Sequence, residues 1–275
     1  MKGPSKAEMV RMIFSSMKRR LTTARLPEGG PDATSQGPGV TVYPPAPVGT
    51  TIYVVGDVHG RADLLEIIHR RIDRDTQDSK GRVLEVYLGD YIDRGGDSAK
   101  TIAKLVKRRE QHELVCLRGN HEDMLLGFLQ DPGCLDAWLR LGAGSTLASY
   151  GVNVGTLASR SRRQVHTELL ANLPQEHADF LETLPSHYEI GGYFFAHAGV
   201  RPSVDLQKQS ENDLTTIRAD FLEHTGDFGR IVVHGHTPVV APEFRPNRIN
   251  IDTGAFATGT LTCLKIGGRG PQVLL

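Results

Sequence analysis

Five short polar segments of the chain contain side chains of the kinds that bind metal ions. The segments begin at Gly56, Gly89, Gly119, His197 and His234. They read Gly-Asp-Val-His-Gly, Gly-Asp-Tyr-Ile-Asp-Arg-Gly, Gly-Asn-His-Glu, His-Ala-Gly and His-Gly-His. Carboxylate and amide oxygens together with imidazole nitrogens suit Mn²⁺, Fe or Zn²⁺ better than Ca²⁺. If the five segments meet in space, they can form one metal site.

Taken singly, each segment also has an ordinary structural explanation. An aspartate after a strand is often a turn former, and Asn120 could simply cap a helix over 121–130. A lone histidine is more often a structural residue than a ligand. Five segments with the same layout make independent coincidence improbable, so we predict that they share a site.

The elements that must position these segments are strands, because each segment follows an apolar run of strand length. The runs are 51–56, 83–88, 113–117, 193–196 and 231–233. Helix-length segments over 61–74 and 97–110 separate the first three runs, which is typical of βαβ units around a largely parallel sheet. Ligands in such sheets bind at the carboxyl ends of strands, where the polar segments would converge. Residues 120–184 are expected to be mainly helical, with further strands at 187–196, 248–252 and 260–266.

In combination and order, the five segments resemble the phosphoprotein phosphatase family of the calcineurin-like metallophosphoesterases. The resemblance is strongest to bacterial and bacteriophage Ser/Thr phosphatases, and it runs from about residue 51 to 266. It implies an α/β fold in which two mixed sheets form a β-sandwich flanked by helices, with metals at the strand-end edge. We therefore expect a catalytic domain over 51–275, with a mainly helical insertion at 124–192.

The resemblance also implies two divalent metal ions, with Mn²⁺ preferred over Fe or Zn²⁺. The implied ligands are Asp57 and His59 for the first metal, Asp90 as a bridge, and Asn120, His197 and His236 for the second. A bridging carboxylate offsets the repulsion between two dications, while asparagine and neutral histidine complete the shell without adding charge. His234 is expected to support His236 rather than to bind metal.

The same resemblance assigns catalytic roles to His121, Asp93, Arg94 and Arg218. His121 would protonate the leaving group, and Asp93 would orient His121 and keep it charged. Arg94 would bind the substrate phosphate through its planar set of donors. A second phosphate-binding arginine is expected ahead of the last histidine motif, and Arg218 is chosen over Arg201 and Arg230.

The implied activity is hydrolysis of phosphoserine or phosphothreonine in proteins, with phosphotyrosine as a further candidate substrate. Water activated between the metals would attack phosphorus directly, without a phosphoenzyme. Symmetrical hydrolysis of diadenosine tetraphosphate uses nearly the same motifs and remains the closest alternative. A non-catalytic binding module is a third, although the intact set of ligands disfavours it.

Charge and composition limit the remaining possibilities. The 275 residues hold 32 basic and 32 acidic side chains, but residues 1–50 hold 7 basic and 3 acidic ones, which leaves the remainder mildly acidic. An acidic body argues against nucleic acid as a partner. Three widely spaced cysteines and no apolar run of membrane-spanning length favour the cytoplasm. Residues 5–22 can form a basic amphipathic helix that either packs on the body or docks on a membrane surface or partner, and 27–50 are predicted to be a linker rich in proline and glycine.

Overall fold

The computed structural model describes residues 42–275. The helix predicted over 5–22 and most of the predicted linker lie outside the described residues. Within the described part, a compact unit begins at Tyr43. The N–H of Ala46 donates to the carbonyl of Gly267 at 3.1 Å, and Tyr193 donates its hydroxyl to the carbonyl of Pro44 at 2.6 Å. Residues ahead of the predicted boundary at 51 therefore pack on the body, because their backbone groups find partners there.

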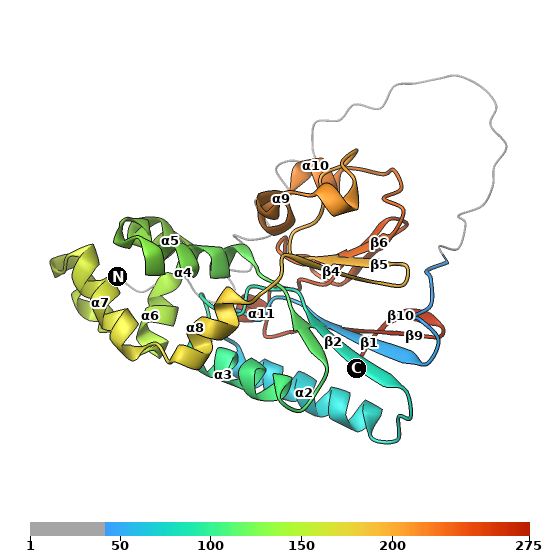
Figure 1. Cartoon of the computed structure of the whole chain (residues 1–275), viewed down its shortest axis with the longest axis horizontal. Helices are drawn as coiled ribbons and strands as arrows, with labels where there is room; N and C mark the ends of the chain where they lie inside the picture. Colours follow the sequence, from blue (N-terminus) through green and yellow to red (C-terminus); the bar gives the residue numbers. More distant parts are fainter. Residues whose placement is uncertain (1–41) are drawn as a thin grey trace. The chain divides into compact units, whose positions relative to one another are not determined.

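The first sheet carries the three strands that precede the first three polar segments. Its order is β10-β9-β1-β2-β3, with β1 parallel to β2 and β2 parallel to β3. The strands are β1 (Thr50–Val55), β2 (Arg82–Tyr87), β3 (Leu114–Cys116), β9 (Cys263–Gly267) and β10 (Gly270–Val273). Helices α2 (Ala62–Thr76) and α3 (Ser98–Arg109) form the crossovers, and Figure 1 shows them together on one face of this sheet.

The second sheet carries the strands that precede the two histidine segments. Its order is β4-β5-β6-β8-β7, and it is also mixed, because β5, β6 and β8 are parallel while β4 and β7 are antiparallel to their neighbours. The strands are β4 (His187–Ile190), β5 (Tyr193–Ala196), β6 (Ile231–His234), β7 (Glu243–Arg245) and β8 (Arg248–Asn250). Helices α9 (Glu211–Thr216) and α10 (Ala219–Leu222) lie beside it (Figure 1).

Strand β1 shows how the sequence produces the layers. Successive side chains of a strand point to opposite faces. Ile52 and Val54 pack in one core with Phe195 and Val233 of the second sheet. Their neighbours Tyr53 and Val55 pack in a different core with residues of α2, α3 and the helical insertion. The two mixed sheets thus form the β-sandwich flanked by helices that the sequence predicted.

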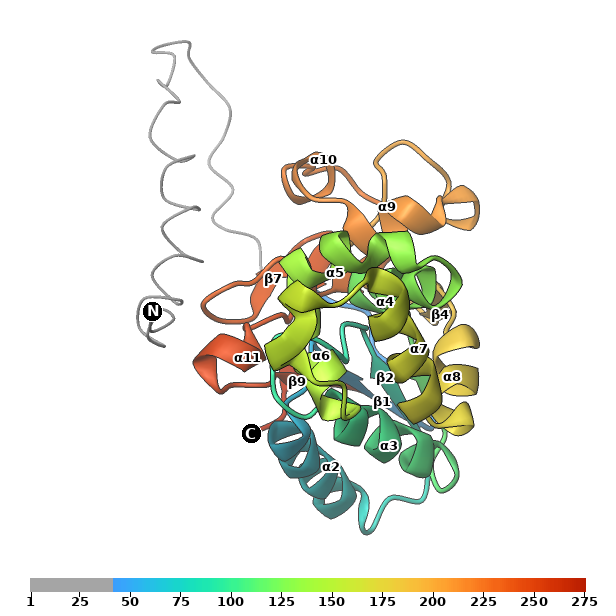
Figure 2. The same ribbon diagram turned by 90° about the vertical axis from the view of Figure 1, so that its left-hand side faces the viewer.

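The predicted insertion is helical up to residue 182 and then enters β4. Figure 2 shows its helices from the side on which they lie. They are α4 (Asn120–Gln130), α5 (Leu135–Leu141), α6 (Ala143–Ser149), α7 (Arg162–Asn172) and α8 (Gln175–Glu182), with short 3₁₀ turns at Pro132–Cys134 and Val154–Ser159. A further 3₁₀ turn spans Leu206–Lys208, and the short helix α11 (Ala255–Thr258) follows β8.

Two further observations concern the predicted setting of the protein. Cys116, Cys134 and Cys263 are all free thiols. Within residues 42–275, no helix is both long and apolar enough to cross a bilayer.

Candidate metal and catalytic site

The polar segments adopt an uncommon backbone conformation where they leave their strands. His59, Asp90, Asp93, Arg94 and His236 all have φ between 46° and 68°. This left-handed region is sparsely populated by residues other than glycine, and such strain persists only where the surroundings enforce it. In other proteins, residues with such backbone strain cluster at functional sites. Their concentration at the strand ends of this chain therefore indicates a candidate site.

Asp90 lies between two groups of side chains that could bind metal ions. These side chains are called the strand-end cluster. Oδ2 of Asp90 is 3.4 Å from Nε2 of His59, and its Oδ1 is 3.3 Å from Nε2 of His197. Two sets of potential metal ligands follow, one with Asp90, His59 and His121 and the other with Asp90, His197 and His236. Asp90 belongs to both sets, which is the arrangement required of a bridging carboxylate.

The second set is completed by Asn120, the first residue of α4. Nε2 of His197 lies 3.2 Å from Oδ1 of Asn120 and 3.2 Å from Nδ1 of His236. The other ring nitrogen of His197 is 2.9 Å from the carbonyl of Leu88, which orients the imidazole toward the cluster. Backbone partners of this kind commonly orient metal-binding histidines.

The first set differs in one respect from the ligand set implied by resemblance. His59 is oriented by the carbonyl of Ile92, 2.9 Å from its Nδ1, so that Nε2 faces Asp90. Asp57 lies beside the cluster, where its Oδ2 accepts a hydrogen bond from the backbone N–H of His236 at 3.0 Å. The tight geometric set contains His121 in place of Asp57. Oδ1 of Asp57 is buried without a hydrogen-bond partner, so Asp57 retains an oxygen that can bind a metal.

The electrostatics of the cluster fit a bound cation. Asp57, Asp90 and Asp252 are each 2% exposed, and Oδ1 of Asp57 is buried without a hydrogen-bond partner. Burial, and then the charge of Asp252, raises the pKa of Asp57 well above its usual value. Burial alone would lower the pKa of His197, but the carboxylate of Asp90 raises it to about 10. Buried carboxylates with unpaired oxygens are costly without a counter-charge, and divalent metals supply it.

His121 and Asp93 form a hydrogen-bonded pair at the edge of this cluster. Nδ1 of His121 is 2.7 Å from Oδ2 of Asp93, and both side chains are fully buried. Nε2 of His121 points the other way, 3.7 Å from Oδ2 of Asp90 and 3.0 Å from Nη2 of Arg94. An arginine only donates, so Nε2 of His121 accepts from Arg94 in this arrangement. If Arg94 turns to another acceptor, the protonated ring can present an N–H to a group bound beside Asp90.

The two predicted phosphate-binding arginines approach the same place. Arg94 contacts Nε2 of His59 at 3.0 Å through Nη1, and its guanidinium lies 4.9 Å from the ring centre of Phe256 in α11. Arg218, which directly precedes α10, donates to the hydroxyl of Thr237 at 3.1 Å. Burial and then the charge of Arg94 lower the pKa of Arg218.

The two arginines that were not chosen as phosphate ligands, Arg201 and Arg230, form ion pairs with other residues. Arg201 binds Asp213 and Asp220 in exposed ion pairs, and Arg230 binds Glu189 at 2.9 Å. His234, expected to play a supporting role, lies outside both potential metal sets. Its Nδ1 is 3.1 Å from the carbonyl of Gly235, and its ring packs edge-on against Phe221.

Several residues at the site received no role from the sequence, including Glu122 of the third polar segment. The carboxylate of Glu122 is fully buried and accepts hydrogen bonds from the backbone N–H groups of Asp90, Tyr91 and Gly119 at 2.8, 2.8 and 3.0 Å. Asp252 follows strand β8 and was detectable, because it repeats the pattern of an aspartate after a strand. Trp138 and Thr146, which bind Asp93, had no such signal.

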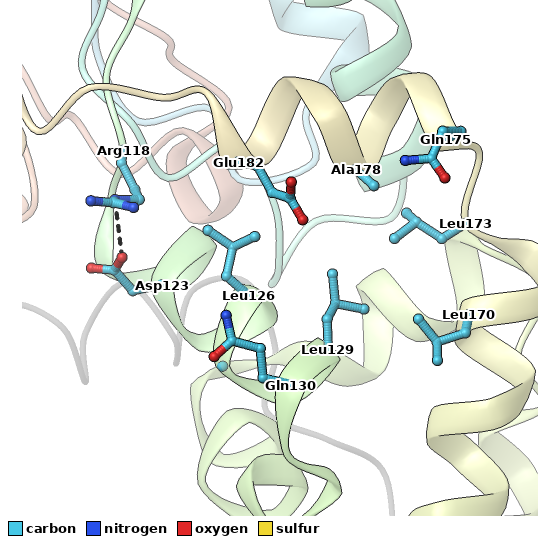
Figure 3. Close-up of a pocket in the computed structure, with 11 residues that line it drawn as sticks. Arg118, Asp123, Leu126, Leu129, Gln130, Leu170, Leu173, Gln175, Ala178 and Glu182 are labelled. Carbon is cyan, nitrogen blue, oxygen red and sulfur yellow. Dashed lines mark ion pairs between the residues drawn. The ribbon is translucent and has the colours of Figure 1, made fainter.

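A pocket of about 610 Å³ lies between α4, α7 and α8. Figure 3 shows the leucines that line it, which are Leu126, Leu129, Leu170 and Leu173. The figure also shows the ion pair between Nε of Arg118 and Oδ1 of Asp123, which are 3.2 Å apart. None of the ten predicted site residues lines this pocket. This pocket is therefore distinct from the strand-end cluster.

Fold and site together define a metallophosphoesterase. A family model for calcineurin-like phosphoesterases matches residues 50–258, and the chain belongs to that family. It is similar to the asymmetrical bis(5′-nucleosyl)-tetraphosphatases PrpE of Anoxybacillus flavithermus and Oceanobacillus iheyensis, with 27% and 29% identity. The alignments cover 77% and 78% of this chain and 89% and 88% of those proteins.

A solved structure supports the fold. The crystal structure of a putative diadenosine tetraphosphatase matches with a TM-score of 0.58 at 20% identity, covering 85% of this chain and 96% of that one. The family predicted from the sequence is thus confirmed at the level of the metallophosphoesterases. The names of the curated relatives match neither the predicted protein phosphatase nor the symmetrical tetraphosphatase considered as its alternative.

Proposed function

We propose that this hydrolase is a metal-dependent phosphomonoesterase that acts on phosphoserine and phosphothreonine in proteins. The main support is the buried His121–Asp93 pair, which lies beside the carboxylate shared by both potential metal sets. A serine or threonine alkoxide is a poor leaving group, and proton donation to it contributes roughly 10²–10⁴ in rate. A phosphate-anhydride leaving group gains far less from such a donor.

The proposed ligands of two divalent metals, Mn²⁺ by preference and Fe or Zn²⁺ otherwise, are those predicted from the sequence. They are Asp57, His59 and Asp90 on one side and Asp90, Asn120, His197 and His236 on the other. When bound, two such metals supply a water of lowered pKa and neutralise charge on the phosphate. The oxygen and imidazole donors present, with the unpaired Oδ1 of Asp57, fit this role.

Arg94 and Arg218 are proposed to hold the substrate phosphate. Nε2 of His59 has one lone pair, which at present accepts from Arg94. If this nitrogen held a metal, its lone pair would no longer be available to Arg94, and phosphate oxygens would match the planar donors of Arg94. The contact of the guanidinium with the Phe256 ring would keep Arg94 near His121. The phosphate is then held next to the proton donor.

The second candidate is asymmetrical cleavage of dinucleoside tetraphosphates, because the curated relatives carry that name over most of their length. The same metal ligands and arginines would serve this reaction. A phosphoserine peptide, a phosphotyrosine peptide and diadenosine tetraphosphate should be compared with the Mn²⁺-loaded protein. We expect the phosphoserine peptide to be cleaved fastest. Rapid cleavage of the dinucleotide alone, to ATP and AMP, would refute the protein-phosphatase proposal.

The role of His121 has its own test. His121→Ala should lower turnover of the phosphoserine peptide at least about tenfold more than turnover of p-nitrophenyl phosphate, whose leaving group needs little protonation. His112→Ala, at a partly exposed histidine near Glu85, serves as a control that should leave both rates unchanged. Equal losses on the two substrates in His121→Ala would contradict proton donation.

A further inference from the structure

The carboxylate of Asp93 is surrounded by hydrogen-bond donors, two of which come from the helical insertion. Its Oδ2 lies 2.7 Å from Nδ1 of His121 and accepts the indole N–H of Trp138 at 2.8 Å. Its Oδ1 accepts the hydroxyl of Thr146 at 2.6 Å. Asp93, His121, Trp138 and Thr146 are all fully buried, so water does not compete for these bonds.

The direction of each bond follows from what the groups can donate. An indole nitrogen only donates, and the hydroxyl of Thr146 has a single proton. That hydroxyl accepts from the backbone N–H of Asp93 at 2.8 Å and also contacts the hydroxyl of Ser98 at 2.9 Å. Its own proton is therefore directed at Oδ1 of Asp93. With both oxygens receiving donors, the carboxylate has one orientation, and Nδ1 of His121 must be the third donor.

The same corner of the insertion also contacts the neighbouring arginine. The N–H of Arg94 donates to the carbonyl of Gly142, between α5 and α6, at 3.3 Å. Gly142 has φ of 111°, and a Cβ there would lie 3.0 Å from Cγ of Arg94. The turn between α5 and α6 is thus built against the backbone that carries both Asp93 and Arg94.

We propose that Trp138 and Thr146 are positioning residues for proton transfer to the leaving group. By holding the Asp93 carboxylate in one orientation, they hold the His121 imidazole with Nε2 directed at the bound phosphate ester. The insertion thereby forms part of the active site. This inference rests on the proposed phosphomonoesterase function, in which His121 is the proton donor.

The test uses the full chain loaded with Mn²⁺ and two aryl esters. Phenyl phosphate has a poorer leaving group than p-nitrophenyl phosphate, so it depends more on proton donation. Trp138→Phe keeps an aromatic ring without the N–H, and Thr146→Val keeps the shape without the hydroxyl. In each variant we expect kcat/KM for phenyl phosphate to fall about tenfold more than for p-nitrophenyl phosphate, a part of the 10²–10⁴ available from a positioned acid.

Two matched variants separate positioning from packing. Tyr150→Phe removes one buried hydrogen bond of the insertion, that to His177 at 3.0 Å, without touching Asp93. Thr146→Ser retains the hydroxyl. Both should keep the wild-type ratio of the two substrates. Equal losses on the two esters in Trp138→Phe and Thr146→Val, or a changed ratio in Tyr150→Phe, would overturn the proposal.

A measurement without turnover tests the contact itself. Trp138 is the only tryptophan of the chain, so its indole N–H gives a single identifiable resonance in a proton–nitrogen NMR spectrum. We expect slow exchange with solvent and a clear shift in Asp93→Asn but not in Tyr150→Phe. An indole signal that exchanges fast or ignores Asp93→Asn would overturn the positioning role. A wild-type protein that cleaves neither ester would instead refute the proposed function.

Discussion

Replacing Glu122 by glutamine tests how the strained strand ends are held. The carboxylate accepts backbone N–H groups on both oxygens, from Asp90 and Gly119 on Oε2 and from Tyr91 and Ile92 on Oε1. An amide can accept on one side only. On its other side, the amide NH₂ would face two backbone donors that are left without partners.

The structure gives the size of the effect. If the amide oxygen retains Asp90 and Gly119, the variant loses one bond of 2.8 Å and one long bond of 3.4 Å. A hydrogen bond to a charged group contributes roughly 1.5–3 kcal/mol, and an orphaned buried donor costs a similar amount. Glutamine also removes the repulsion between the charges of Glu122 and Asp90, which offsets part of this loss. We therefore expect a net loss of about 2 kcal/mol in the free energy of unfolding, which leaves a typical domain folded.

Urea denaturation of the metal-free protein measures this loss. Burial, followed by the charge of Asp90, raises the pKa of Glu122 to about 7, so the comparison belongs at pH 8, where the carboxylate is ionised. The control is Asp123→Asn on the same helix, which breaks a partly exposed pair with Arg118 and should cost less than about 1 kcal/mol. A loss below about 1 kcal/mol in Glu122→Gln, or an equal loss in Asp123→Asn, would refute the reasoning.

Three further predictions concern metal binding, pH and the N-terminal segment. Asp57→Asn should weaken Mn²⁺ binding at least about tenfold in calorimetry without lowering the unfolding free energy of the metal-free protein, and unchanged affinity would exclude Asp57 as a ligand. Burial, and then the charge of Arg108, lowers the pKa of His69 to about 3 from 6.5. As pH falls below 6.5, the unfolded chain therefore takes up a proton that buried His69 does not. Between pH 8 and pH 5, the free energy of unfolding should fall by about 2 kcal/mol more in the wild type than in His69→Gln. An equal fall in the two proteins would argue against this. Removal of residues 1–41 should change p-nitrophenyl phosphate turnover less than about twofold, because all predicted site residues lie between Asp57 and His236, and a large loss would show that the segment acts on the site.

The sequence alone determined the three parallel strands of the first sheet and the residues that follow them. The run before Asp57 is apolar and β-branched, and it ends at a glycine, so strand and turn are both encoded within a few residues. The same holds for Asp90 after β2 and Asn120 after β3. Short edge strands were missed: β7 and β10 span only 243–245 and 270–273, too few residues for a clear alternating pattern.

The tertiary structure alone decided which distant side chains meet. No spacing in the sequence shows that Trp138 and Thr146, 45 and 53 residues after Asp93, donate to its carboxylate. These contacts depend on how the insertion packs against the strand ends, and packing is a property of the whole core. Motif spacing is local and is readable from residue types, whereas the orientation of the His121–Asp93 pair is set by residues from another part of the chain.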